Sequence, residues 1–189
     1  MKYGVPIKEN EMLIDSAREF TDEHWENIQK LKNSTWVDYP KKKVFISFSE
    51  PDRKMMTNLK NALKKSELLQ PLVIEDKREG AKSLPDLIIK GINESDYYIS
   101  ILSKVSMSSQ WVNQELGYAI SRSRELEVIP IVESIIIHDL KGFVNSNKQL
   151  SYQFSITGDD RKDRKLFRDT YKEVITYIEN SVLKEIKRV

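Results

Sequence analysis

The chain has 189 residues, 32% of them charged and 39% hydrophobic, which suits one globular domain with a short appendage. Lys and Arg (31) exceed Asp and Glu (29) by two, and the two signs are interspersed, so bulk charge does not favour nucleic acid or an anionic membrane as a partner. The sequence has no cysteine and two histidines, which excludes thiol chemistry and zinc–thiolate sites, and we expect no bound metal.

The first 42 residues differ from the rest of the chain. Between residues 12 and 31, apolar side chains recur at roughly helical spacing, namely Leu13, Ala17, Phe20, Trp25, Ile28 and Leu31. We expect residues 1–42 to form a helical extension that ends near Pro40, because proline disfavours helix at the residue before it. No apolar run has the length of a signal peptide core or of a membrane span, so we expect a cytoplasmic protein with no membrane partner.

From residue 43 onward, short apolar segments alternate with amphipathic ones. We expect strands at residues 44–48, 72–74, 97–102, 128–132 and 152–154. We expect helices after Pro51, over about residues 84–92, from about Ser109 to Arg122, and over a last segment whose apolar stripe runs from Phe167 to Val182. This alternation indicates βαβ units, and therefore a parallel sheet with right-handed crossovers. We predict an α/β fold: a flavodoxin-like, doubly wound, mostly parallel five-stranded sheet with a short N-terminal helical extension.

In such a sheet, ligands bind beyond the carboxyl ends of the strands, near the point where the strand order reverses. We therefore expect chemistry in the loops after residues 48, 74 and 102. The six glycines fit neither the dinucleotide fingerprint nor the Walker phosphate loop. Neither His24 nor His138 lies in one of these loops, which argues against a hydrolase with a Ser-His-Asp triad.

The segment after the predicted strand 97–102 carries two helical stripes. Val112 and Leu116 begin an apolar stripe that faces the core. Trp111, Glu115 and Tyr118 form a second stripe rotated by about 100°. An indole and a carboxylate are thus expected side by side at the crevice. The pattern alone also fits a structural interpretation, in which Trp111 is a half-buried packing residue and Glu115 is a solvated charge on the helix surface.

Four segments, in this order, resemble Toll/interleukin-1 receptor (TIR) domains. Residues 44–48 resemble their first conserved box, Glu79 and Gly80 the turn of their BB loop, Leu102, Ser103 and Trp111-x-x-x-Glu115 their αC segment, and residues 128–131 their fourth strand. The likeness runs from about residue 43 to residue 132. It predicts a TIR domain over residues 43–189, with residues 1–42 outside it.

The resemblance implies an activity. TIR domains that are enzymes cleave the nicotinamide–ribose bond of NAD+, and they have a Glu four residues after the Trp of αC, the position of Glu115. It therefore implies an NAD+ glycohydrolase or cyclase that has NAD+ as substrate, needs no other cofactor and releases ADP-ribose or a cyclic isomer. A stand-alone chain of this kind resembles the TIR component of Thoeris-type antiphage defence in bacteria, whose product is a signal for a separate effector protein.

Other TIR domains are non-catalytic adaptors or scaffolds that act through TIR–TIR contacts, and in that alternative Glu115 is incidental. A third reading is a domain that binds a nucleotide without turnover.

A single carboxylate suffices for the chemistry. Nicotinamide leaves as a neutral base, so no general acid is needed, while positive charge develops on the ribose as in glycoside hydrolysis. Glu115 is expected to stabilise that charge, and Trp111 to stack on the pyridinium.

Further positions are expected to bind substrate. They are Ser47, Phe48 and Ser49 after the first strand, Arg53 beside a helix start that offers N–H groups to a phosphate, Ser103 at a strand end, and Arg78 and Lys82 in the BB loop. The BB loop is also the expected surface for self-association. Enzymatic TIR domains often have a basic residue directly after the aromatic one, whereas this sequence has Ser49 and Glu50.

Overall fold

The computed structural model of the chain describes residues 39–74, 83–139 and 151–188. Most of the expected N-terminal extension, residues 1–38, lies outside the described residues. Arg78 and Lys82 lie outside them as well. In the described part of the chain, no helix combines the length and the hydrophobicity that crossing a membrane requires.

Five strands form one parallel sheet. They are β1 (Lys42–Ser47), β2 (Leu69–Leu72), β3 (Tyr97–Leu102), β4 (Glu127–Glu133) and β5 (Tyr152–Phe154). Their spatial order is β2-β1-β3-β4-β5, and every neighbouring pair is parallel. The chain winds outward from β1 in both directions, so the strand order reverses between β1 and β3. This arrangement confirms the doubly wound five-stranded sheet.

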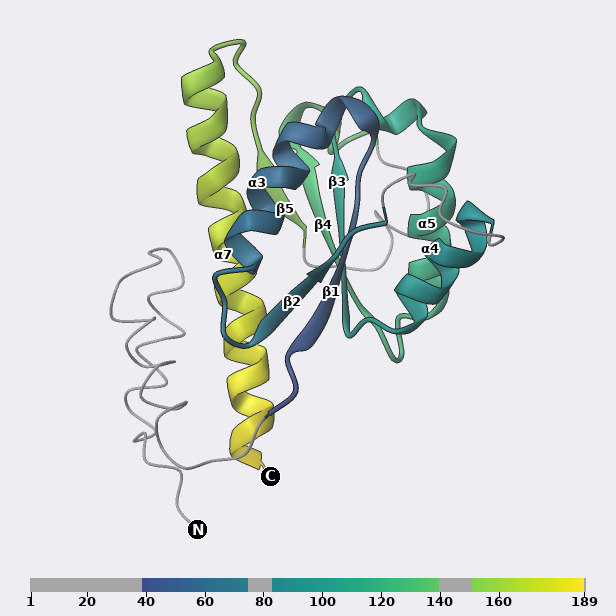
Figure 1. Cartoon of the computed structure of the whole chain (residues 1–189). Helices are drawn as coiled ribbons and strands as arrows, with labels where there is room; N and C mark the ends of the chain where they lie inside the picture. The colour runs from purple at the N-terminus through teal and green to yellow at the C-terminus, as the bar shows by residue number, and fades with distance from the viewer. Residues whose placement is uncertain (1–38, 75–82, 140–150, 189) are drawn as a thin grey trace.

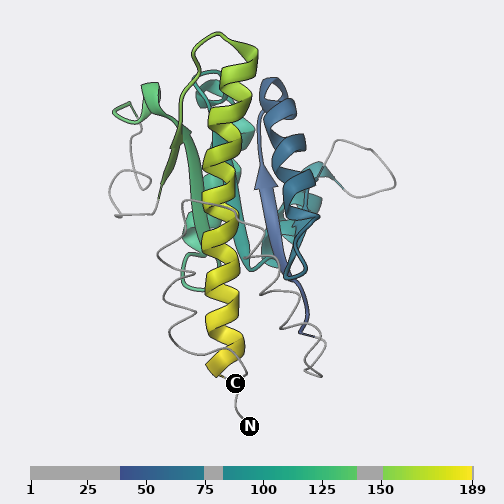
Figure 2. The ribbon, with the colours of Figure 1, turned by 90° about the vertical axis from the view of Figure 1, so that its left-hand side faces the viewer.

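Helices cover both faces of the sheet. The turn η1 (Glu50–Asp52), α3 (Arg53–Leu63) and the long α7 (Asp160–Arg188) lie on one face, and α4 (Leu84–Asn93) and α5 (Gln110–Ser121) lie on the other (Figure 1). Short 3-10 turns, η2 (Ser106–Ser108) and η3 (Ser134–Ile136), follow β3 and β4. Figure 2 shows α7 running along the height of the sheet beside α3. The fold is therefore a three-layer sandwich.

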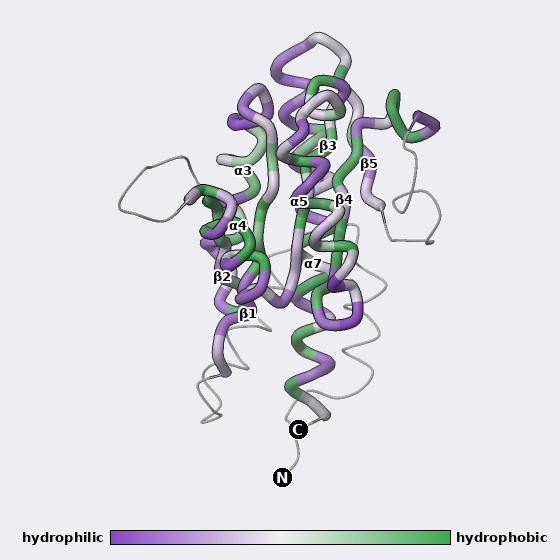
Figure 3. Tube along the Cα trace, turned by 90° about the vertical axis from the view of Figure 1, so that its right-hand side faces the viewer, coloured by the Kyte–Doolittle hydropathy of each residue, from purple (hydrophilic) through white to green (hydrophobic). Residues whose placement is uncertain are grey.

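The two faces give the domain two apolar clusters. Along β1, Val44 and Ile46 belong to the cluster under α3 and α7, whereas Phe45 belongs to the cluster under α4 and α5. All six residues of β3 are buried, as expected for a central strand covered on both sides. Figure 3 shows hydrophobic residues along the central strands, and hydrophobic and hydrophilic residues alternating along the helices around them. Since Ser47 follows Phe45 by two residues, its side chain lies on the α5 face.

A glycine lets α4 approach the sheet closely. A Cβ atom at Gly91 would lie 2.8 Å from the ring of Phe45, and that ring is stacked on Tyr98 with centroids 5.7 Å apart. The ring therefore has little freedom to move aside.

The edge strand begins earlier than the sequence pattern indicated. β2 spans Leu69–Leu72, whereas the prediction placed a strand at residues 72–74. Pro71 weakens the strand signal, but it is tolerated because β2 is at the edge of the sheet. The last pair in the register is Phe45 with Leu72, so Val73 and Ile74 lie beyond the ladder.

Candidate functional site

The carboxylate of Glu115 lies at the strand reversal point. Ser109 caps the start of α5, where its side chain accepts a hydrogen bond from the N–H of Val112. Val112 and Leu116 are buried on the side of α5 that packs against the sheet. Glu115 precedes Leu116 and is partly buried, and its Oε2 accepts a hydrogen bond of 2.5 Å from Ser47 Oγ at the end of β1.

The surroundings of Glu115 act on its pKa in opposite directions. Burial raises the pKa of Glu115, and the hydrogen bond from Ser47 lowers it, with a net shift upward. On β3, the phenol of Tyr98 is buried, and its hydroxyl has no hydrogen-bond partner among the described residues. Burial, with the charge of Glu115 added, holds the pKa of Tyr98 well above its ordinary value. The carboxylate of Glu115 therefore lies close to a buried, neutral phenol.

Trp111 lies one helical turn before Glu115, and its side chain is 49% exposed. On the same stripe, the hydroxyl of Tyr118 donates to Asn93 of α4 at 2.8 Å, and Arg122 donates to the same oxygen at 2.6 Å. These bonds hold α5 against α4. Trp111 and Glu115 thus lie on one helix, and hydrogen bonds to β1 and to α4 fix the position of that helix.

A second polar cluster lies after β1 and β3, on the α3 face. Asp52 is 3% exposed, and its Oδ2 accepts hydrogen bonds from Ser49 Oγ at 2.7 Å and from Ser103 Oγ at 3.0 Å. Burial is the main cause that raises the pKa of Asp52, and the charge of Glu133 adds to it. The hydroxyls of Ser49 and Ser103, both expected to bind substrate, therefore point at a buried carboxylate that was not among the expected site residues.

The loop after β3 is held by the same cluster. The N–H of Ser103 donates to Ser106 Oγ at 2.6 Å, and the N–H of Lys104 donates to Glu133 Oε2 at 2.7 Å. Glu133, at the end of β4, is itself buried. Two carboxylates and two serines thus fix the start of the segment that leads to Trp111.

Phe48 and Arg53 contact each other. The guanidinium of Arg53 lies 5.6 Å from the ring centroid of Phe48, and it donates two hydrogen bonds to Glu50, at 2.6 and 2.7 Å. Phe48 packs against the cluster under α3 and α7, which is the face opposite Glu115. Pro51 has no N–H, and the N–H of Asp52 donates to the backbone of Ser49. The N–H of Asp52 and two N–H groups of the Arg53 guanidinium therefore already have acceptors within the chain.

The structure therefore divides the expected site residues into groups. Ser47 lies with Glu115, Ser49 lies with Ser103 around Asp52, and Phe48 lies with Arg53. Its sequence position did not mark Asp52 as a site residue, because an acidic residue after proline at a helix start is typical of a cap. The side chain of Asp52 makes no capping hydrogen bond.

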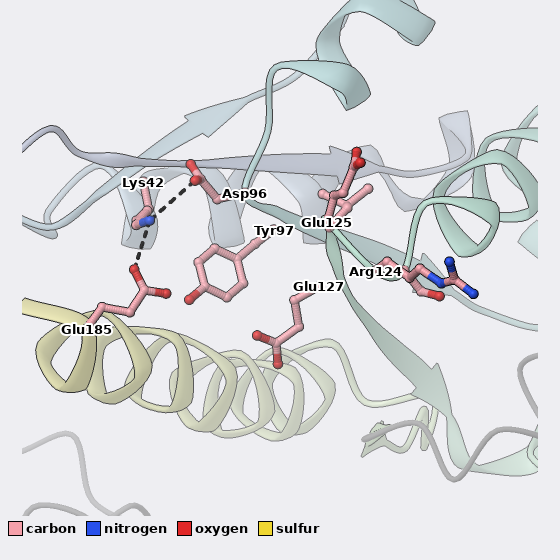
Figure 4. Close-up of a pocket in the computed structure, with 9 residues that line it drawn as sticks. Lys42, Asp96, Tyr97, Arg124, Glu125, Glu127 and Glu185 are labelled. Carbon is pink, nitrogen blue, oxygen red and sulfur yellow. Dashed lines mark ion pairs between the residues drawn. The ribbon is translucent and has the colours of Figure 1, made fainter. Parts of the chain in front are cut away.

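A pocket of 380 Å³ lies at the other end of the strands (Figure 4). Lys42, the first residue of β1, lies between Asp96 and Glu185, at 3.5 and 2.9 Å. The ring of Tyr97 lies between Glu185 and Glu127. Lys42 thus pairs with two of the acidic residues that line the pocket, and the length of β1 separates it from Ser47. Within the described ranges, no group of three or more His, Cys, Asp or Glu residues is placed to hold a metal ion.

The molecule is thus an open parallel α/β domain with a partly buried carboxylate beyond the carboxyl ends of its central strands, which is where domains of this class bind their ligands. Residues 44–166 match the family model described as "TIR domain". The chain belongs to the TIR domain family. Among curated proteins, none matches this chain significantly.

Solved structures with a similar fold include other TIR proteins. The TIR domains of the activated Roq1 resistosome, which directly recognizes the pathogen effector XopQ, are 23% identical over 72% of this chain and 84% of that chain, with a TM-score of 0.47. A metazoan TIR-STING receptor from C. gigas is 15% identical over 71% of this chain and 42% of that chain, with a TM-score of 0.49. A 2-desoxiribosyltransferase from Leishmania mexicana is 24% identical over 48% of this chain and 65% of that chain, with a TM-score of 0.39.

Proposed function

We propose that this TIR domain cleaves the nicotinamide–ribose bond of NAD+, with Glu115 as its catalytic residue. The observation that carries the proposal is the position of one partly buried carboxylate, one helical turn after a half-exposed indole, at the reversal point of the sheet. Membership of a family that includes NAD+-cleaving enzymes supports the same reaction.

The chemistry matches what these residues supply. The pyridinium of NAD+ is a cation, and the exposed face of Trp111 offers a stacking surface for it. As the bond to ribose breaks, the electron pair stays with nicotinamide, which departs as a neutral base, and positive charge develops on the ribose. An ionised Glu115 stabilises that charge, and it does so more strongly because burial keeps part of the water away. Attack by water then gives ADP-ribose, and attack by a hydroxyl of the substrate itself gives a cyclic isomer.

Self-association is part of the proposal. Beyond the ends of β3, β4 and β5, exposed apolar side chains surround the carboxyl edge of the sheet, namely Val105, Trp111, Ile135 and Ile156. Exposed apolar surface beside a site is typical of an interaction surface. A second copy of the chain that docks there, or against the BB loop, would complete the pocket over Glu115.

We further propose that the released nucleotide is an immune signal that reaches a separate effector, as in the bacterial antiphage systems that the sequence resembles. Chromatography and mass spectrometry of the products distinguish ADP-ribose from its cyclic isomers.

The experiment is to incubate the purified protein with NAD+ and to measure nicotinamide. We expect the Glu115→Gln variant to lose about 10²–10³-fold or more in turnover, the scale for removal of one electrostatic stabiliser. Glu125→Gln is the matched control, since Glu125 is an exposed glutamate that pairs with Arg122 shortly after α5. Full turnover in a folded Glu115→Gln variant would refute the catalytic assignment. Absence of turnover at every protein concentration would favour the adaptor function.

A further inference from the structure

We propose that Ser47 is a positioning residue for Glu115, whose hydroxyl fixes the orientation of the carboxylate at the end of β1. The inference rests on the proposed function, because it assigns a role within the same site. It changes the role first expected of Ser47, which was contact with substrate.

Burial argues against contact between Ser47 and substrate. Ser47 is 1% exposed, and its hydroxyl already donates a 2.5 Å hydrogen bond to Glu115 Oε2. This is the only hydrogen bond to the Glu115 side chain found among the described residues. The carboxylate has two oxygens, and Ser47 engages one of them, so the second stays available for a ribose hydroxyl.

The register of the sheet explains why Ser47 can hold this carboxylate. Ser47 is the last residue of β1, and its side chain points to the face that α5 covers, because side chains alternate along a strand. α5 packs against both β1 and β3. The hydrogen bond therefore joins the helix that carries Glu115 to the centre of the sheet, and its length is set by the packing of two rigid elements.

The hydrogen bond also favours one charge state. A hydroxyl that donates to a carboxylate stabilises the ionised form, which is the form that the reaction requires. Among the described residues, the other ionisable group facing Glu115 is Tyr98 of β3, whose phenol stays neutral. On α4, Asp86 accepts a hydrogen bond from Ser83, and Lys90 pairs with Glu94. In η2 there is no titratable residue, and the lysines of β1 lie at its opposite end.

The same sheet provides a matched control. Ser100 of β3 lies directly opposite Ser47 in the register and is 0% exposed. Its hydroxyl has no hydrogen-bond partner among the described residues. Ser47→Ala and Ser100→Ala thus remove the same atom at the same depth from neighbouring strands, and only the first removes a hydrogen bond to Glu115.

The test combines a titration with kinetics. The side-chain carboxyl of Glu115 is followed by carbon-13 NMR against pH in the full chain, and its signal is assigned by its loss in Glu115→Gln. We expect Ser47→Ala to move the titration of Glu115 to higher pH, and to lower kcat for NAD+ by about 10-fold or more, the scale of a hydrogen bond to a charged group. The acid side of the activity profile should move in the same direction. Ser100→Ala should change neither the titration of Glu115 nor kcat. Ser47→Thr, which keeps the hydroxyl, should have a Glu115 titration and a kcat close to those of the native chain.

The outcomes separate this inference from the proposed function. An unmoved titration of Glu115 in Ser47→Ala would overturn the role of Ser47, whatever the activity. A moved titration together with a fully active Glu115→Gln variant would overturn the catalytic role of Glu115 while supporting the contact. Equal losses in Ser47→Ala and Ser100→Ala, with no rescue by Ser47→Thr, would reduce Ser47 to a packing residue.

Discussion

Glu115 is held in a place that favours its neutral form, although the proposed reaction needs its charge. Burial raises its pKa, and the hydroxyl of Ser47 opposes that rise only in part. A carboxyl whose pKa is higher in the folded state than in the unfolded state binds more protons when folded. Its contribution to the free energy of unfolding is therefore present at low pH and is lost as the pH rises through the raised pKa.

The raised pKa of Glu115 predicts how removal of its charge changes the stability of the fold. Replacement by glutamine removes the buried charge and keeps the shape, so Glu115→Gln should unfold at a higher temperature than the native chain at pH 7. The difference should shrink as the pH falls toward about 4, the ordinary value for a glutamate, because the native carboxyl is then protonated as well. Thermal unfolding followed by circular dichroism at a series of pH values measures it. A lower melting temperature for Glu115→Gln at neutral pH would contradict this account.

Asp52 is the residue for which we expect the largest loss of stability near the site. It joins two loops, because hydroxyls from Ser49 and Ser103 converge on its carboxylate. Asp52→Ala leaves those buried hydroxyls without their acceptor, so we expect a loss of about 1–3 kcal/mol in the free energy of unfolding, measured by denaturant titration.

The control for Asp52 is Glu50→Ala. Glu50 lies two residues earlier on the surface and pairs with Arg53, and exposed ion pairs contribute little, so its removal should leave the denaturation midpoint nearly unchanged. Equal effects of the two substitutions would show that Asp52 does not link the loops.

Among the helices, two glycines allow a paired test. Gly91 in α4 lies against Phe45, whereas a Cβ atom at Gly117 in α5 would meet nothing within 4 Å. Gly91→Ala should destabilise the domain by about 1–3 kcal/mol, because the stacked ring of Phe45 resists displacement. Gly117→Ala should stabilise it by about 0.5–1 kcal/mol through helix propensity. Chemical denaturation of both variants measures the difference, and the same sign for both would refute the close packing of α4.

Strands whose signal is local were predictable from sequence. The strands at residues 97–102 and 152–154 were placed with the observed bounds. A mostly apolar run defines the first, and an alternation of aromatic and polar residues, Tyr152, Gln153 and Phe154, defines the second. β2 was displaced because its Pro71 is tolerated only at a sheet edge, and the edge position depends on the whole topology. The proximity of Trp111 and Glu115 follows from helical spacing. The link from Ser103 to Asp52 spans 51 residues, and no periodicity reports such a contact.

For the assembled protein, we expect activity that depends on concentration. Apolar residues such as Val105 and Ile135 are exposed beyond the carboxyl ends of the strands, and a weak contact between copies there would cover the proposed site at Glu115. The rate of NAD+ cleavage per molecule should therefore rise with protein concentration and fall on dilution. Val105→Asp should reduce this rise, whereas Ile89→Asp, which changes an exposed apolar residue on α4, should not. A rate strictly proportional to concentration down to nanomolar protein would contradict self-association.

The hydroxyl of Tyr39 donates to Glu185 at 3.0 Å, and Lys42 binds the same carboxylate. The start of the described body and the end of α7 therefore meet at the amino edge of the sheet, the pole opposite Glu115. The protein can be immobilised on a sensor chip through residue 39 or residue 188, which both lie near the amino edge of the sheet. The carboxyl edge would then face the flowing solution. Under the proposed function, NAD+ and soluble copies of the chain would then approach the edge that carries Glu115 from the solution.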